Sequence, residues 1–139
     1  MRATRRPTTT LTLLAAQAVT VAALTAFVAG PAGASGGGDD AVRTNGSCSG
    51  STDWKMKAKS DDGRIEVESE VDSNKVGQNW NWKLKDDGAL VSSGSSTTTG
   101  PSGSFEVQRK PANRAGTDHF VFRAVNPKSG EVCRGTVAW

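Results

Sequence analysis

The sequence predicts an all-β fold, a seven-stranded antiparallel sandwich that follows a cleaved N-terminal signal helix. Three observations predict it. Apolar and polar residues alternate in several runs after residue 46, turn residues separate these runs, and no helical periodicity occurs outside the first 34 residues. The remaining stretch of about 90 residues suits seven short strands in two packed sheets.

Residues 1–34 have the composition of an export signal. The segment begins with arginines, residues 11–29 are uncharged and mostly apolar, and Ala32-Gly33-Ala34 offers the small side chains of a cleavage site. An uncleaved membrane anchor is the alternative, because about 20 apolar residues span a bilayer. The threonines and the glutamine of the segment disfavour an anchor. We therefore expect a secreted, extracellular protein that has no membrane attachment after cleavage.

Removal of the signal changes the charge of the protein. The chain has 17 basic and 14 acidic residues, and the loss of Arg2, Arg5 and Arg6 leaves 14 of each sign. A neutral protein lacks the basic excess that supports binding to nucleic acid or to an anionic membrane. We expect neither of these partners, and we expect a monomer.

The chain after the signal divides into a short tail and one domain. Residues 35–46 begin with a serine and three glycines and predict a flexible mature N-terminus, and residues 47–139 form the sandwich. Two cysteines in an exported chain most simply form one disulfide, so Cys48 and Cys133 should join the first strand to the last. Two cysteines and one histidine without close spacing do not make a metal site, and we expect no metal and no cofactor.

The strands are predicted from runs whose apolar residues share one face. Asp61-Asp62-Gly63 and Asp86-Asp87-Gly88 each follow such a run and should form hairpin turns. The lysines of the first run should pair with the glutamates of the second across the sheet. The stretch 92–104 is dominated by serine, threonine and glycine and predicts a mobile edge or loop. The seven strands comprise residues 54–59, 64–71, 79–85, 89–91, 105–110, 119–125 and 132–139.

One segment resembles a known family. A turn at Ala115-Gly116-Thr117-Asp118 precedes the apolar positions Phe120, Phe122 and Ala124, and a short loop with Gly130 follows them. This pattern resembles the last hairpin of immunoglobulin-like and fibronectin type III-like domains, which implies an immunoglobulin-like sandwich. The whole chain is also similar to small secreted actinomycete proteins of unassigned function, and that likeness implies no functional residues.

The tryptophans allow two interpretations. Trp54, Trp80 and Trp82 alternate with polar residues and share their faces with other apolar side chains, which is typical of core positions. Alternatively, the indoles stack on sugar rings while Asn79 and Asn81 donate and accept hydrogen bonds. A Trp-x-Trp strand between two terminal cysteines is similar to that of some bacterial carbohydrate-binding modules.

Residues of catalytic type occur without a catalytic pattern. His119 is the only histidine of the chain, and no serine stands in a nucleophile motif. The aspartate pairs precede glycines, as turn residues do, and Glu66, Glu68 and Glu70 alternate outward as a solvated strand face. We expect no enzyme and no catalytic residue.

The sequence therefore predicts a secreted, non-enzymatic binding or interaction module of unknown ligand, either an extracellular protein or a glycan. A carbohydrate-binding module that uses the tryptophans is the alternative. A protease inhibitor that presents residues 92–104 is a weaker alternative, because an inhibitory loop is rigid and this stretch is rich in glycine and serine.

Overall fold

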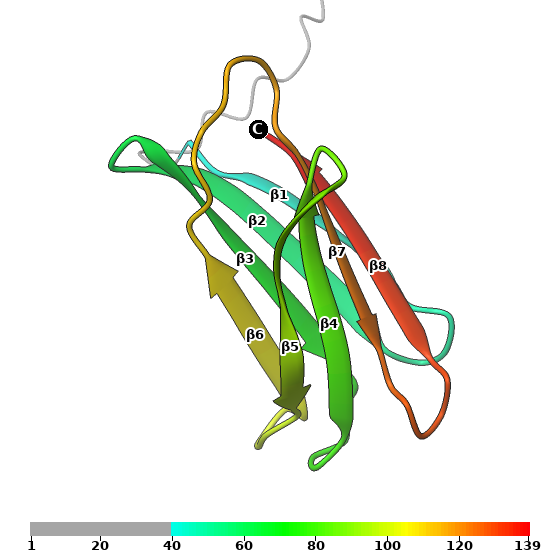
Figure 1. Cartoon of the computed structure of the whole chain (residues 1–139). Coiled ribbons are helices and arrows are strands. Elements are labelled where there is room, and N and C mark those ends of the chain that lie inside the picture. Colours follow the sequence, from blue (N-terminus) through cyan, green and yellow to red (C-terminus); the bar gives the residue numbers. More distant parts are fainter. Residues whose placement is uncertain (1–39) are drawn as a thin grey trace, which may run out of the picture. The chain divides into compact units, whose positions relative to one another are not determined.

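The computed structural model describes residues 40–139, which form eight strands and no helix (Figure 1). The predicted signal of residues 1–34 lies outside the described residues. The strands are β1 (Val42–Ser47), β2 (Asp53–Asp61), β3 (Arg64–Asp72), β4 (Asn79–Asp86), β5 (Ala89–Thr97), β6 (Ser104–Arg109), β7 (His119–Val125) and β8 (Val132–Ala138).

The strands form two antiparallel sheets of four, which lie as two layers in Figure 1. Sheet A has the strand order β1-β2-β3-β6, and sheet B has the order β5-β4-β7-β8. The predicted all-β, two-layer architecture is confirmed. The number of strands was wrong, because the structure has eight strands and not seven.

The additional strand is β1, which lies in the segment that was predicted to be a flexible tail. Its residues pair with β2 along the whole strand, from Val42 opposite Ala58 to Ser47 opposite Asp53. The sequence Val-Arg-Thr-Asn-Gly-Ser has no alternation of apolar and polar residues. Backbone hydrogen bonds to β2 therefore define this edge strand, and side-chain pattern does not reveal it.

Both predicted Asp-Asp-Gly hairpin turns are confirmed. The second aspartate and the glycine of each turn have positive φ angles, 47° at Asp62 and 75° at Gly63, and 46° at Asp87 and 85° at Gly88. Aspartate and glycine tolerate this left-handed conformation, which the tight two-residue hairpin turn requires. The turns join β2 to β3 and β4 to β5.

The core lies between the sheets and is built from the apolar faces that alternation predicts. Trp80 is fully buried, Trp82 is 5% exposed, and Trp54 is half-buried against the same cluster. The remaining core side chains are Met56, Ala58, Ile65, Val67, Val71, Leu84, Phe105, Val107, Phe120, Phe122, Ala124, Cys133 and Val137.

Two tryptophans lie over glycines of the neighbouring edge strands. Gly46 of β1 is opposite Trp54 of β2, and Gly94 of β5 is opposite Trp82 of β4. A Cβ atom built on either glycine would lie 2.8 Å from the tryptophan Cζ2 atom. Each indole ring thus occupies the space that a side chain of the edge strand would need.

The stretch 92–104 begins as strand and ends as loop. β5 continues to Thr97 and pairs with β4 at the edge of sheet B, with a register shift between Leu84 and Lys85. The strand predicted for residues 89–91 therefore extends to residue 97, and residues 92–97 lie in an edge strand, one of the two predicted forms. The following residues turn toward β6, where Thr99 and Ser104 form an isolated bridge.

A disulfide closes one side of the sandwich, as the sequence predicts. Cys48 directly follows β1 of sheet A and is bonded to Cys133 in β8 of sheet B. Next to this bond, the Thr44 hydroxyl donates a hydrogen bond of 2.7 Å to the carbonyl oxygen of Thr136. The opposite side is closed by Arg109 of β6. Its Nε donates to the Ser92 hydroxyl at 3.0 Å, and its guanidinium lies 4.9 Å from the centre of the Trp82 ring.

Candidate functional site

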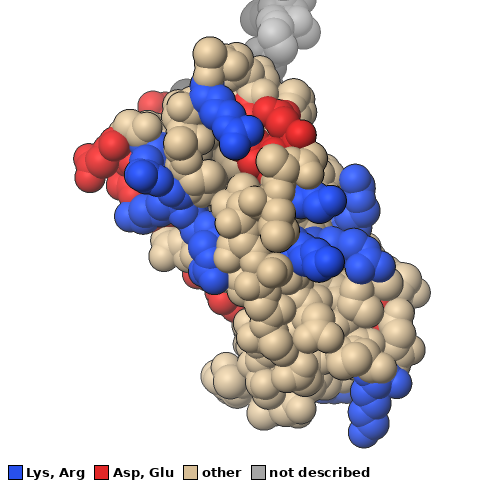
Figure 2. Space-filling model, viewed as in Figure 1, with Lys and Arg blue, Asp and Glu red and all other residues tan. Residues whose placement is uncertain are grey.

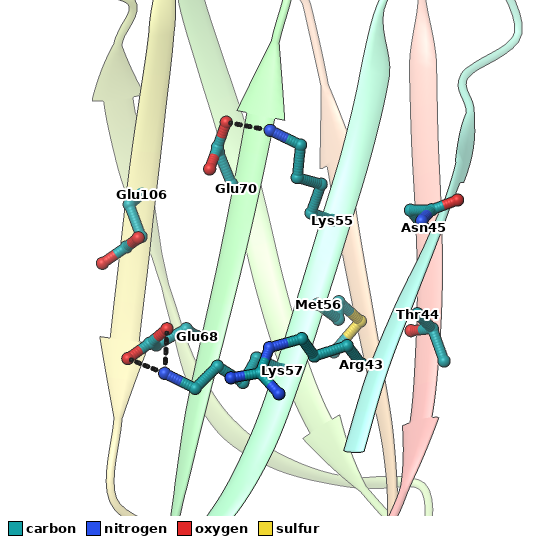
Figure 3. A pocket seen from close by; sticks show the side chains of 9 residues that line it. All are labelled: Arg43, Thr44, Asn45, Lys55, Met56, Lys57, Glu68, Glu70 and Glu106. Atoms are coloured by element: carbon teal, nitrogen blue, oxygen red, sulfur yellow. Dashed lines mark hydrogen bonds and ion pairs between the residues drawn. The ribbon is translucent and has the colours of Figure 1, made fainter. Parts of the chain in front are cut away.

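The outer face of sheet A carries charges that are already paired. Three lysines of β2 lie opposite three glutamates of β3, as the alternation predicts. Figure 3 shows two of these pairs beside a depression of about 230 Å³. The nitrogen–oxygen distances are 3.0 Å for Lys55–Glu70, 3.1 Å for Lys57–Glu68 and 2.9 Å for Lys59–Glu66.

Glu66 is less solvated than its outward position suggests. It is 6% exposed, because Lys59 and Lys110 cover its carboxylate. The hydrogen bond from Lys59 lowers the pKa of Glu66 against the opposing effect of burial. On the neighbouring strand, burial and the nearby Glu68 and Glu70 raise the pKa of Glu106. Sheet A therefore has an excess of carboxylates, and its three lysines of β2 are already engaged by glutamates and are poorly available to an anionic ligand.

The outer face of sheet B is different, because four cations gather there. Lys83 of β4 lies opposite Arg123 of β7, and Arg123 lies opposite Arg134 of β8, so three cations form a row across three strands. Lys85 lies two residues beyond Lys83 on the same face, and all four side chains are exposed. We call Lys83, Lys85, Arg123 and Arg134 the basic face. In Figure 2, blue side chains gather on the right of the molecule over these strands.

The cations of the basic face have no carboxylate partner within residues 40–139. The ion pairs of this part of the chain involve Lys55, Lys57, Lys59, Lys110, Arg114 and His119, and none involves the basic face. Like charges placed directly opposite each other in a sheet are destabilising. The row thus carries an electrostatic cost that the fold does not offset locally.

Apolar side chains accompany these cations. Lys85 lies opposite Val121 on one side and Leu90 on the other, and Leu90 is 59% exposed. The four cations and Val121 line a shallow groove of about 450 Å³. A second hollow adjoins it, and is lined by Asn81, Trp82, Lys83, Ser93, Gly94, Arg123 and Val125. A ligand on this face therefore meets positive charge together with apolar and amide groups.

The structure separates the predicted sugar-binding residues. Trp80 and Trp82 point into the core, and the Trp82 indole nitrogen donates to the Ser96 hydroxyl at 3.0 Å. Asn79 and Asn81 are exposed on the opposite face of β4, where the Asn79 Oδ1 atom accepts a hydrogen bond of 2.8 Å from Ser95. The asparagines lie next to the basic face, the buried rings of Trp80 and Trp82 are not open for stacking, and Trp54 is half-buried in β2 of the other sheet.

His119 is exposed at the start of β7. Its Nδ1 atom lies 3.1 Å from the Asp87 Oδ1 atom, which is its one side-chain hydrogen bond in the described part of the chain. A Ser-His-Asp site would also need a serine hydroxyl within hydrogen-bond reach of the ring. The side-chain hydrogen bond of His119 is to the carboxylate of Asp87.

Sequence reasoning missed Arg123 and Arg134. Alternation placed Lys83 and Lys85 outward, and the same alternation places Arg123 outward between the core residues Phe122 and Ala124. What the sequence does not contain is the order of the strands, which brings β4, β7 and β8 together. The net charge of the chain without its predicted signal is zero, and this sum gives no indication of the local excess of positive charge on sheet B.

Comparison with protein-family models, with curated proteins and with solved structures found no match to this chain. Residues 40–139 contain no helix that is long and apolar enough to cross a membrane.

Proposed function

We propose that this protein is an extracellular, non-enzymatic binding module and that its basic face binds an acidic glycan. The observation that carries the proposal is the row of three cations, Lys83, Arg123 and Arg134, which lie in register without a carboxylate partner in the described chain. A stability cost that the fold does not offset is expected where a surface serves a ligand.

The geometry favours a ligand with several separated negative charges. Neighbouring strands are about 4.8 Å apart, so the row spans roughly 10 Å. The guanidinium groups of Arg123 and Arg134 match carboxylate or sulfate groups through paired hydrogen bonds. The groove is open and shallow, which suits an extended chain, and Asn81 at its side can bond to hydroxyl groups. These features together describe a glycan that carries carboxylate or sulfate groups.

The overall charge argues for a glycan over nucleic acid. The protein without its predicted signal is formally neutral, so long-range attraction to a densely charged polymer is weak. Four neighbouring cations act over a short range, because salt screens exposed charges within about 8 Å at physiological ionic strength. A glycan with one charge per sugar, which is less densely charged than a nucleic acid duplex, satisfies both conditions when it contacts the face.

Secretion and an immunoglobulin-like topology complete the proposal. The disulfide is compatible with an oxidising, extracellular location, and residues 1–34 have the composition of an export signal. The strand orders β5-β4-β7-β8 and β2-β3-β6 follow the C′-C-F-G and A-B-E orders of immunoglobulin-like sandwiches, with β1 as an added edge strand. Such sandwiches host many functions, so the basic face and not the fold supports the ligand class.

Binding to polygalacturonate, a carboxylated glycan, tests the proposal. We expect the purified protein to bind it at about 20 mM NaCl and to lose most of this affinity at about 300 mM NaCl, because salt screens exposed charges. The double variant Lys83→Ser/Arg123→Ser should weaken the affinity at least about tenfold. The matched control, Lys55→Ser/Lys57→Ser, removes the same charge from sheet A and should change the affinity by less than about twofold.

Three results would contradict the proposal. Absence of binding to polygalacturonate removes the ligand class. Equal losses in the two double variants show that net charge matters and the basic face does not. Retention on neutral cellulose or chitin, independent of salt, supports the carbohydrate-binding alternative.

A further inference from the structure

Three aspartates meet at the end of sheet B where the β4–β5 turn approaches β7. Asp86 is the last residue of β4, Asp87 lies in the turn, and Asp118 immediately precedes β7. The pairing of Asp86 with Phe120 and the hydrogen bond of 3.0 Å from the Asp87 amide to the His119 carbonyl hold the two segments together. One oxygen of each carboxylate lies within 4.8 Å of the other two.

Two of these carboxylates are buried and incompletely bonded. Asp86 and Asp118 are each 1% exposed, and the Oδ1 atom of each has no hydrogen-bond partner. Their Oδ2 atoms face one residue, Arg114. Its Nε atom lies 3.8 Å from Asp86, and its backbone amide donates to Asp118 at 3.3 Å. A buried carboxylate oxygen without a partner costs free energy, and Arg114 leaves one oxygen of each buried aspartate without a partner.

We propose that Asp86, Asp87 and Asp118 bind a calcium ion. The three side chains offer oxygen atoms only, which is the ligand type that Ca²⁺ prefers and that softer metals do not require. Three carboxylates and the Arg114 guanidinium sum to two negative charges, which one divalent cation neutralises. Two of the three carboxylates, those of Asp86 and Asp118, are the buried ones whose Oδ1 atoms have no hydrogen-bond partner.

Asp118 makes this arrangement different from an ordinary turn. The Asp61-Asp62-Gly63 turn has the same sequence as the Asp86-Asp87-Gly88 turn, but no third carboxylate joins it among residues 40–139. Asp61 forms an ion pair with Lys110 instead. The Asp61-Asp62-Gly63 turn is therefore a matched control within the same molecule.

The ion would connect three distant segments. The Asp118 amide donates to the Trp139 carbonyl at 2.9 Å, and the Trp139 amide donates to the Asp118 carbonyl at 3.0 Å. A cation held by Asp118 and Asp86 thus joins the β4–β5 turn, the start of β7 and the residue after β8. We expect calcium to stabilise the folded state through this connection, independently of the basic face.

Calorimetric titration of the purified, EDTA-treated protein with CaCl₂ tests the site. We expect one ion per chain, with a dissociation constant of about 10⁻⁴ to 10⁻³ M, the range of extracellular calcium modules. About 5 mM CaCl₂ should also raise Tm, because an ion that binds only the folded state stabilises it. Asp118→Asn should weaken the binding at least about tenfold, and Asp62→Asn should leave it unchanged.

The outcomes separate calcium from its competitors. Absence of both heat and a Tm shift at about 10 mM CaCl₂ overturns the proposal. An equal Tm shift in the Asp118→Asn variant also overturns it, because the ion then binds elsewhere. A Tm that rises on acidification and not with CaCl₂ shows that Asp86 and Asp118 share a proton in place of a metal, which equally overturns it. Asp118→Asn removes a buried charge, so we expect this variant to remain folded.

Discussion

At the scale of single residues, identical sequences take different environments. Both Asp-Asp-Gly turns could be predicted from sequence, and the positive φ angles of Asp62 and Asp87 confirm them. The burial of Asp86 could not be predicted, because it depends on the pairing of β4 with β7, where Asp86 lies opposite Phe120, 34 positions away in the sequence. The amino-acid sequence of a turn determines its backbone conformation, whereas the neighbouring strand determines how far the turn side chains are exposed to solvent.

The pH dependence of stability should report this burial. Burial, followed by the nearby Asp118, raises the pKa of Asp86. The folded protein then holds this proton more tightly than the unfolded chain does, so the contribution of Asp86 to stability falls as pH rises through the raised pKa. In EDTA at pH 7, Asp86→Asn should therefore raise Tm by about 4 °C. Thermal unfolding followed by circular dichroism measures this shift.

The charged neighbours define the control for this measurement. Arg114 favours the charged form of Asp86, while Asp87 and Asp118 oppose it. The advantage of Asp86→Asn should disappear below about pH 4, where the wild-type carboxyl is protonated in both states. Asp62→Asn should leave Tm unchanged across the same range. An Asp86→Asn variant that is less stable than wild type at pH 7 would show that Arg114 compensates the buried charge.

At the scale of elements, alternation identified most strands and failed at two edges. β2, β3, β4 and β7 have apolar residues on every second position, and each was predicted. β1 and the second half of β5 consist largely of small polar residues and glycine, which give no burial pattern. The reason lies in the neighbouring strand, because Trp54 and Trp82 supply the apolar surface for both edges.

Gly94→Ala should test the role of the Trp82 ring over β5. The added Cβ atom would lie 2.8 Å from Trp82 Cζ2, so the ring or the strand must move. We expect a loss of about 1–3 kcal/mol in the free energy of unfolding, as for other overpacked sites. Urea denaturation followed by tryptophan fluorescence measures it.

Two variants define what the Gly94→Ala result means. Ser93→Ala changes an exposed neighbour on the same strand and should alter stability by less than about 0.5 kcal/mol. In a Trp82→Leu background the cost of Gly94→Ala should shrink, because the clashing ring atom is gone. An undiminished cost in that background would show that the loss arises from the backbone of β5.

At the scale of the whole molecule, architecture could be predicted and surface chemistry could not. The sandwich and the Cys48–Cys133 bond follow from alternation and from the position of two cysteines near the ends of the domain. The basic face was missed, because net charge is a sum over the molecule and Lys83, Arg123 and Arg134 come from three strands. The strand order is the missing information.

Removal of the disulfide should show how far the core alone sustains the fold. The bond joins residues 85 positions apart, and closing a loop of this length stabilises by about 4–5 kcal/mol in the chain-entropy account. A domain of this size has about 5–15 kcal/mol in total. Cys48→Ser/Cys133→Ser should therefore be marginally stable at 37 °C. Thermal unfolding measures the loss, and wild-type protein treated with a reductant should show the same one. A Tm within about 2 °C of wild type would contradict the prediction.

The two sides of the sandwich are closed by different kinds of interaction. A covalent bond holds the β1–β8 side, whereas the β5–β6 side depends on the contacts of Arg109 with Ser92 and Trp82. Local opening of the native state should thus begin between β5 and β6 and pivot about the cysteines. The first interior group that water would reach in such a fluctuation is the Trp82 indole. Tryptophan fluorescence should therefore report the opening of the β5–β6 side.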